Sequence, residues 1–285
     1  MNLNSEWPTL LLASWRGRPD GENGGGKLVE ALQAQCIDAR WVVWDDPSVD
    51  WAQADAVAIR SAWDYHERLP EFLRWARGIA GVTHLLNGAD AVAWSSDKAY
   101  LLDLARVGVP IVPTMQPERV SAGLAESFAR WGSVVVKPRV GAGGSGVTVL
   151  DAPPSLNATR AGCHESGCRT YDDGTWLAQP HVPSVHTLGE SSVFVFGGVP
   201  VTQVDKTARR RAVALDADRA GVAAAAVQAA AWSIGRLPDY ARVDLLNWQG
   251  RWCVSELELI EPSLYLDVEP SNAQHFAALV RECLL

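Results

Sequence analysis

Two glutamates near the C-terminus have the type and spacing of metal ligands. Glu256 and Glu258 alternate with leucines in residues 253–260, a segment with the composition of a β-strand. Because every second side chain of a strand lies on the same face, both carboxylates share one face and the leucines point toward a core. Like charges on one face repel unless a cation lies between them, and oxygen ligands suit Mg²⁺. The pattern predicts a magnesium site; the alternative is an edge strand with acidic side chains facing solvent.

Asp244, on the preceding predicted strand, is expected to supply a third carboxylate, with Arg242 two residues earlier on the same face. If the two strands pair symmetrically about residues 247–250, Asp244 lies opposite Cys253 and faces away from the glutamates. An odd-length turn or a β-bulge would correct this register. The guanidinium of Arg242 is suited to a phosphate or a carboxylate, so Arg242 is a candidate anion-binding residue.

The glycine-rich residues 141–146 match two nucleotide-binding patterns, but their context fits neither. A dinucleotide fold needs a helix after G-x-G-x-x-G, and a P-loop needs a lysine where Val147 stands. What remains is a loop between two strands, which can close over phosphates with its backbone N–H groups or can be a plain flexible hairpin. Lys137, at the end of the preceding apolar strand, favours the phosphate interpretation because a buried lysine needs an anionic partner.

Strands and helices alternate in the first third of the chain, which predicts a small parallel sheet. The expected strands are residues 9–14, 39–44, 56–60 and 82–86, and the expected helices are residues 28–35 and a helix opened by Pro70. Ligands collect at the carboxyl ends of such strands. The residues at or after those ends, which we expect to bind substrate, are Arg16, Arg60, Trp63 and Asp64. Arg60 and Asp64 would hold a carboxylate and an ammonium group; an internal salt bridge between them is the alternative.

The remainder of the chain predicts an antiparallel α+β region, because turn signals at residues 197–198 and 247–250 form hairpins. We expect a helix at residues 95–108 and an alanine-rich helix at 219–235. The expected strands are residues 133–138, 146–150, 176–179, 192–196, 199–204, 241–246 and 252–260.

Composition narrows the classes of partner. The net charge of −8 argues against a nucleic-acid-binding surface, and no apolar stretch near the start is long enough to cross a membrane. No basic segment precedes that stretch, so a cytoplasmic location is expected. The five scattered cysteines fit reduced thiols. Cys163, His164 and Cys168 could form half of a zinc site, but a second ligand pair at the usual spacing is missing, which favours a surface loop.

From about Trp94 to the C-terminus, six motifs resemble the ATP-grasp superfamily in their order and spacing. They are Asp97-Lys98, Val134-Val135-Val136-Lys137-Pro138 with the glycine loop, Leu177-Ala178-Gln179-Pro180-His181-Val182, Gly189-Glu190, Ala241-Arg242-Val243-Asp244, and Glu256-Leu257-Glu258. The resemblance implies a fold of α/β and α+β class. A small parallel N-terminal substrate-binding domain (residues 1–94) would precede an ATP-grasp region (95–285). That region would contain a mobile ATP-binding lobe at about 133–198 and a metal-binding lobe at 199–285.

The resemblance also implies roles for individual residues. The residues that would bind ATP are Lys98, Lys137, Gly141, Gly143, Gly144, Ser145, Gly146, Gln179, His181, Val182 and Glu190. Asp244, Glu256 and Glu258 would hold Mg²⁺, while Lys206 and Arg242 would stabilise the transferring phosphoryl group. Many members of the superfamily have asparagine where Glu258 stands, which leaves the number of metal ions open.

The implied activity is an ADP-forming ligase that joins carbon to nitrogen on a small, amino-acid-like substrate. Residues 61–66 and 258–265 resemble a subgroup close to glutathione-synthetase-like enzymes. This subgroup includes D-cycloserine synthetases, which close a ring from O-ureido-D-serine. The alternatives are a non-catalytic nucleotide-binding module and a kinase that releases a phosphorylated small molecule. No nucleic acid or membrane partner is expected, and a homodimer stays open.

Overall fold

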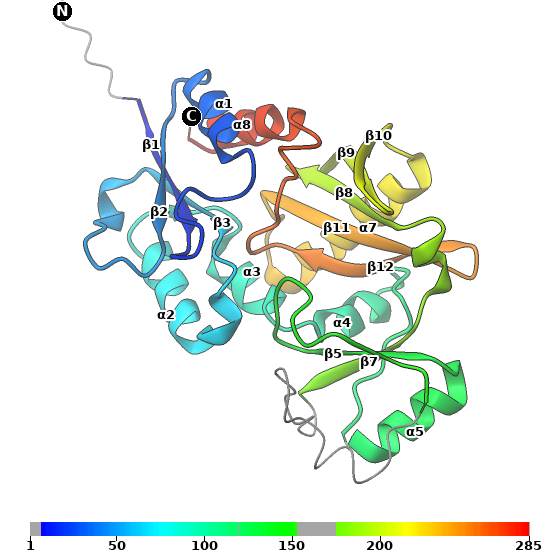
Figure 1. Ribbon diagram of the computed structural model, residues 1–285. Coiled ribbons are helices and arrows are strands. Elements are labelled where there is room, and N and C mark those ends of the chain that lie inside the picture. Colours follow the sequence, from blue (N-terminus) through cyan, green and yellow to red (C-terminus); the bar gives the residue numbers. More distant parts are fainter. Residues whose placement is uncertain (1–6, 119, 153–174, 285) are drawn as a thin grey trace, which may run out of the picture.

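A computed structural model describes residues 7–118, 120–152 and 175–284, and three β-sheets organise this part of the chain (Figure 1). Residues 163–168, with the cysteine–histidine cluster considered above, lie outside the described residues. Three short 3₁₀ helices connect other elements: η1 (Trp51–Gln53), η2 (Tyr65–Glu67) and η3 (Pro183–His186). No helix among the described residues is long and apolar enough to cross a membrane.

The first sheet is parallel, as predicted, with the strand order β2-β1-β3-β4. Its strands are β1 (Thr9–Ser14), β2 (Asp38–Val43), β3 (Ala56–Ser61) and β4 (His84–Leu85). Its helices are α1 (Gly25–Gln33), α2 (Leu69–Ala80) and α3 (Gly88–Ser95). The central strand β1 reads as a continuous apolar run because both faces of the sheet are covered: Leu10 packs toward α1 and Leu11 toward α2.

The C-terminal helix α8 (Ser271–Leu284) returns to this sheet and packs beside α1 (Figure 1). Phe276 and Val280 from α8 share one apolar core with Leu10 and Leu28 of the N-terminal region. The helix was not predicted from the sequence. It completes a face of the N-terminal sheet that residues 1–94 do not cover alone.

The second sheet is antiparallel, as predicted, with the order β10-β9-β8-β11-β12. Its strands are β8 (Glu190–Phe196), β9 (Val199–Lys206), β10 (Arg210–Val213), β11 (Tyr240–Trp248) and β12 (Arg251–Glu258). The alanine-rich helix α7 (Ala217–Ile234) covers one face of this sheet (Figure 1), and its alanines pack on Val193 and Val243. Gly235 ends the helix in the left-handed conformation (φ 76°) that glycine adopts without strain. On the opposite face, Phe194 and Tyr240 pack against α8, while Arg242 and Asp244 carry polar groups.

The third sheet has the order β6-β5-β7 and packs against α5 (Val120–Trp131). Its strands are β5 (Val134–Pro138), β6 (Thr148–Leu150) and β7 (Trp176–Pro180). The glycine-rich residues 141–146 join β5 to β6, so the predicted strand–loop–strand context is confirmed.

One predicted helix was wrong. Residues 95–108 form the end of α3 and a separate helix α4 (Tyr100–Arg106), with a break at residues 96–99. The break makes specific contacts: the side chain of Asp97 accepts a hydrogen bond from the Ala99 N–H (2.9 Å), and the Lys98 N–H donates to the Arg139 carbonyl (2.8 Å). In a continuous helix the Lys98 N–H would bond within the helix, and this hydrogen bond to Arg139 at the start of the glycine loop could not form.

Candidate nucleotide and metal site

A β-bulge decides which way Asp244 faces. A two-residue turn at Gln249 and Gly250 joins β11 to β12, and the strands pair regularly as far as Leu245 and Val254. The register then shifts, so that Asp244 lies opposite Glu256 and Ser255 is the additional residue. Of the two features that would bring Asp244 to the face of the glutamates, an odd-length turn or a β-bulge, the structure has the bulge.

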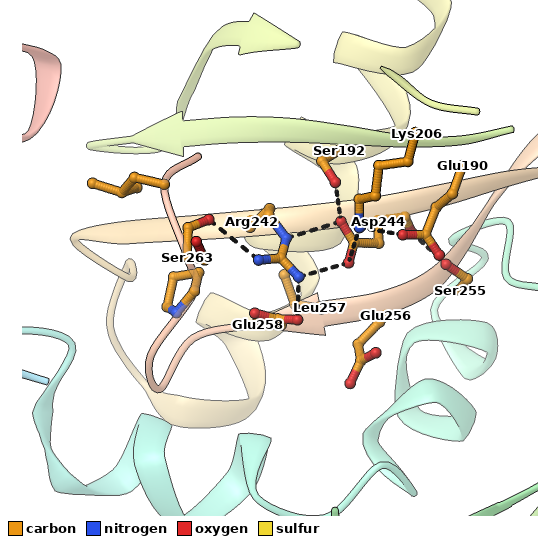
Figure 2. A network of polar contacts seen from close by, with 12 residues as sticks. Glu190, Ser192, Lys206, Arg242, Asp244, Ser255, Glu256, Leu257, Glu258 and Ser263 are labelled. Atoms are coloured by element: carbon orange, nitrogen blue, oxygen red, sulfur yellow. Dashed lines mark hydrogen bonds and ion pairs between the residues drawn. The ribbon is translucent and has the colours of Figure 1, made fainter. Parts of the chain in front are cut away.

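Three carboxylates converge on this face of the sheet. One oxygen each from Asp244, Glu256 and Glu258 lies within 4.8 Å of the other two (Figure 2). Asp244 comes from β11 and the two glutamates from β12, so rigid strands position all three. Such an oxygen donor set fits Mg²⁺, which binds carboxylates together with nucleotide phosphates.

Three cations, Arg242, Lys206 and Lys98, neutralise these carboxylates, and Figure 2 shows the first two. Arg242 donates to both oxygens of Asp244, at 3.0 and 2.9 Å, and also to Glu258. Lys206 lies 3.4 Å from Asp244 and is ion-paired with Glu190. Outside the network of Arg242, Lys98 lies 3.1 Å from Glu256. Phosphate groups would offer these cations new partners and would leave the carboxylates to a metal ion.

One carboxylate of the site, Glu258, has a pKa near neutral. Burial raises the pKa of Glu258 to about 7; Arg242 opposes this effect, and Asp244 and Glu256 add to it. Burial alone would also raise the pKa of Asp244, but Arg242 and Lys206 hold it well below its usual range. A metal ion favours the ionised carboxylate, so we expect metal binding to release a proton from Glu258.

Lys137 reaches the same site from β5. Its side chain is 7% exposed, and its Nζ donates to the carbonyl of Ser255, the bulge residue, at 3.1 Å. Burial lowers the pKa of Lys137 to about 8; Glu256 acts in the opposite direction and Lys98 adds to the lowering. The bulge thus aligns Asp244 and also orients a carbonyl toward this lysine.

The glycine loop is tied to the site at its first residues. Asp97 is ion-paired with Arg139, and the Nζ of Lys98 donates to the carbonyl of Gly141. Gly143 and Gly144 have φ values of 59° and 75°, and a Cβ at either position would meet open space. Their left-handed backbone, not crowding, therefore favours glycine there. Residues 141–143 of the loop line the neighbouring cavity, and the role of residues 141–146 in covering phosphates stays a prediction.

A cavity of about 330 Å³ lies beside the carboxylates, between the N-terminal sheet, the glycine loop and β12. Its aromatic side chains are Trp63, Tyr65, Tyr100 and Tyr265. Its charged side chains are Lys98, Arg242, Glu256, Glu258 and Glu261. Of the four predicted substrate residues, Trp63 lines this cavity.

The structure contradicts direct substrate contact for Arg60. Its side chain has no exposed surface, forms an ion pair with Glu22 (3.0 Å) and donates to the Pro262 carbonyl (2.6 Å). The alternative salt bridge to Asp64 is also not formed. Asp64 instead accepts hydrogen bonds from Trp44 Nε1 and Arg68, each at 2.9 Å.

Asp64 and Arg16 also lie outside the lining of the cavity. Arg16 is 71% exposed and lies 3.3 Å from Asp45. Both side chains are committed to partners within the N-terminal sheet region. Their prediction as substrate contacts is not supported, because the sequence places strand ends at the site but does not show which side chains turn inward.

The residues predicted to bind adenine are not part of this cavity. Gln179 donates to Thr114 Oγ1 at 2.8 Å, and the His181 N–H donates to the Ser133 carbonyl at 3.0 Å. Val182 packs with Val112 and Cys253 in a small apolar cluster. Their nucleotide role stays a prediction.

Two of the cavity side chains that sequence reasoning missed lie beside its charged groups. Tyr265 places its ring 5.3 Å from Lys206 Nζ and 5.0 Å from the Arg242 guanidinium, within range for cation–π contacts. Glu261 is 8% exposed and contributes a further carboxylate. The only sequence signal for Glu261 was its place three residues after Glu258, where the strand period no longer predicts its direction.

Comparison with known proteins identifies the family. The chain is 34% identical to the cycloserine biosynthesis protein DcsG of Streptomyces lavendulae, over 90% of this chain and 92% of that protein. A family model for the D-cycloserine synthetase DcsG N-terminal domain matches residues 10–87. The chain belongs to the DcsG family. It is an ATP-grasp ligase of the ADP-forming class.

Solved structures agree with this assignment. The crystal structure of D-cycloserine synthetase DcsG has a TM-score of 0.86 and 31% identity, covering 97% of this chain and 100% of that chain. The ATP-grasp ligase PsnB, in complex with a phosphomimetic precursor variant, Mg and ADP, has a TM-score of 0.63 and 16% identity. It covers 100% of this chain and 97% of its own and shows the shared fold. The predicted fold class is therefore confirmed.

Proposed function

We propose that this chain is a Mg²⁺-dependent ligase that uses ATP to phosphorylate a carboxylate or ureido oxygen of a small amino-acid-like substrate. A nitrogen nucleophile then displaces the phosphate. The observation that carries the proposal is the convergence of Asp244, Glu256 and Glu258 with Arg242 on a cavity of about 330 Å³. Membership of the family of D-cycloserine synthetase supports a nucleophile within the same molecule, so that the reaction closes a ring.

Different residues would neutralise the charges of the nucleotide phosphates, the metal ion and the transferring phosphoryl group. Lys98 and Lys137 would bind the phosphates of ATP, while the three carboxylates would hold the metal. Mg²⁺, when bound, neutralises phosphate charge. Arg242 and Lys206 would stabilise the charge of the transferring phosphoryl group, because both cations already lie on the cavity side of the sheet.

The chemistry occurs in two balanced steps. In the first, a substrate oxygen forms a bond to the γ-phosphorus as the bond from that phosphorus to ADP breaks. In the second, the nitrogen forms a C–N bond and releases its proton to solvent, and inorganic phosphate leaves with the electrons of the C–O bond. The acyl phosphate is labile to water, so closure of residues 141–146 over the cavity would protect it.

ADP release with product analysis tests the proposal. Purified protein with ATP and Mg²⁺ is assayed against D- and L-amino acids and ureido amino acids, including O-ureido-D-serine. Mass spectrometry of the product distinguishes the alternatives. We expect substrate-dependent ADP and inorganic phosphate with a product that contains no phosphorus. A phosphorylated product would show a kinase, and ADP release that no substrate stimulates would contradict the proposal.

A further inference from the structure

Glu261 differs from the other carboxylates of this site in having no partner within the part of the chain that the structure describes. It is 8% exposed and lines the cavity. Asp244, Glu256 and Glu258 are each ion-paired with an arginine or a lysine. Among the described residues, by contrast, no hydrogen bond or ion pair engages the Glu261 side chain. Burying a carboxylate without a counter-ion is costly, so a fold that holds one at a cavity wall indicates a cationic ligand.

The segment that carries Glu261 is held from two sides. Arg60 donates to the Pro262 carbonyl at 2.6 Å, and Arg242 donates to the Ser263 carbonyl at 3.2 Å (Figure 2). Glu22 accepts hydrogen bonds from Ser263 Oγ (2.8 Å) and the Leu264 N–H (2.7 Å). These contacts fix the backbone on the C-terminal side of Glu261, and the residue itself is buried at the cavity wall.

The surroundings of Glu261 fit an organic cation better than a metal ion. The oxygens that converge to metal-binding distance are those of Asp244, Glu256 and Glu258, and Glu261 is not among them. The wall of the cavity also carries the rings of Trp63 and Tyr65, and aromatic faces attract ammonium groups. Burial, with the nearby Glu258, raises the pKa of Glu261 well above its usual value, which a bound cation would reverse.

We infer that Glu261 binds the ammonium group of an amino-acid substrate, while Arg242, which lines the same cavity, faces the substrate carboxylate or its phosphorylated form. This inference rests on the proposed function and adds to it which end of the substrate carries the ammonium group and where that group binds. A zwitterion would satisfy the unpaired anion and the cation of one small cavity. The ammonium group takes no part in bond making; its contact with Glu261 orients the reacting end of the molecule.

Glu261→Gln tests this inference, because it keeps the shape of the side chain and removes the charge. With the best substrate from the panel, we expect the KM for the amino-acid substrate to rise about tenfold to a hundredfold. The KM for ATP and the Mg²⁺ requirement should not change. Glu261→Asp, which retains the charge, should recover part of the loss. Asp267→Asn is a matched control, since Asp267 is an exposed carboxylate farther along the same segment, paired with Arg210 at 3.4 Å.

A substrate analogue with hydrogen in place of the ammonium group completes the test. The wild type and Glu261→Gln should use this analogue equally well, because neither then gains from the charge. Thermal midpoints of the variants establish that they are folded. An unchanged KM for the amino substrate, or a changed Mg²⁺ requirement, would overturn the inference and leave the ligase proposal standing. A wild type that no substrate stimulates would overturn both.

Discussion

Two buried arginine–carboxylate pairs lie in this molecule, and they serve different ends. Arg60 and Glu22 are fully enclosed, with side chains 0% and 1% exposed, and the Arg60 guanidinium lies 5.1 Å from the ring centroids of both Tyr240 and Phe276. Arg242 and Asp244 are nearly as buried, at 7% and 4%, but Arg242 lines the cavity and both belong to a cluster of several carboxylates and cations.

The difference teaches how to distinguish a structural pair from a working one. The Arg60–Glu22 pair binds residues 262–264 through the Pro262 carbonyl, Ser263 Oγ and the Leu264 N–H, so it fixes a loop, and neither side chain lines the cavity. The cluster around Arg242 brings carboxylates within metal-binding distance and keeps its cations within reach of a phosphate. Burial does not distinguish the Arg60–Glu22 pair from the Arg242–Asp244 pair. The two pairs differ in their access to a cavity and in the number of carboxylates that converge on them.

The largest expected effect is loss of activity in Glu256→Gln. Removing one carboxylate weakens the metal site, and we expect ADP release to fall by about three decades or more. The side chain of Glu256 is 33% exposed, so the thermal midpoint should change little. Excess EDTA should abolish wild-type activity. Normal ADP release by the variant, or by the wild type in EDTA, would remove the metal role.

Lys137→Ala should lose about two to three decades in kcat/KM, because a phosphate-binding ammonium group is removed from a buried position. Steady-state ADP release, with nucleotide affinity measured by calorimetry, checks this expectation. Lys27→Ala is a suitable control, since Lys27 donates to the Leu266 carbonyl (3.1 Å) away from the cavity lining. Full turnover by Lys137→Ala would show that the ATP site lies elsewhere.

Arg60→Ala should act on stability. The variant leaves Glu22 buried without its cation, so we expect a loss of about 3–5 kcal/mol in the free energy of unfolding. The double variant Arg60→Met/Glu22→Gln should recover part of this loss. Denaturant unfolding measures both. If Arg60→Ala instead keeps its stability and loses only substrate affinity, Arg60 contacts substrate after all.

Nucleotide binding should weaken above about pH 8, where burial places the pKa of Lys137. The protonated lysine binds phosphate, so affinity is present below that pH and falls by up to about tenfold per unit as the pH rises. In the nucleotide-free protein the sign is opposite. A folded-state pKa below the ordinary value of 10.5 means that stability rises between about pH 8 and 10.5. Calorimetric titration of a non-hydrolysable ATP analogue tests the affinity, and Lys137→Ala should flatten the profile.

The smallest expected effect is a change in hydrogen exchange at residues 141–146. Their left-handed glycines allow rearrangement, so amide exchange should slow when the ATP analogue and Mg²⁺ are added. Amide exchange in the part of β11 after Asp244, which lies outside the site, should not change. Unchanged exchange in the glycine loop would contradict its role as a lid.

Much of the fold could be predicted because its signals are local. The apolar run of β1 gave its bounds to the residue, and Gly235 marks the end of α7 as expected. Helices α5 and α8 were not predicted, although α8 carries a local signal, because Ala273, Phe276, Ala277 and Val280 recur at helical spacing; which surface that apolar face covers is decided by long-range packing. The break before α4 depends on Arg139, more than forty residues away.

The sequence by itself determined the chemistry available: alternating glutamates on one strand, a lysine at the end of another, and a glycine loop between two strands. These follow from side-chain type and strand period, which neighbouring residues specify. Only the tertiary structure decided how the groups are used. A one-residue bulge at Ser255 set the direction of Asp244, and Glu22 and Pro262 enclosed Arg60. Among the described residues, Glu261 remained the unpaired carboxylate of the cavity, since the two cations in its lining, Lys98 and Arg242, are ion-paired with other acids.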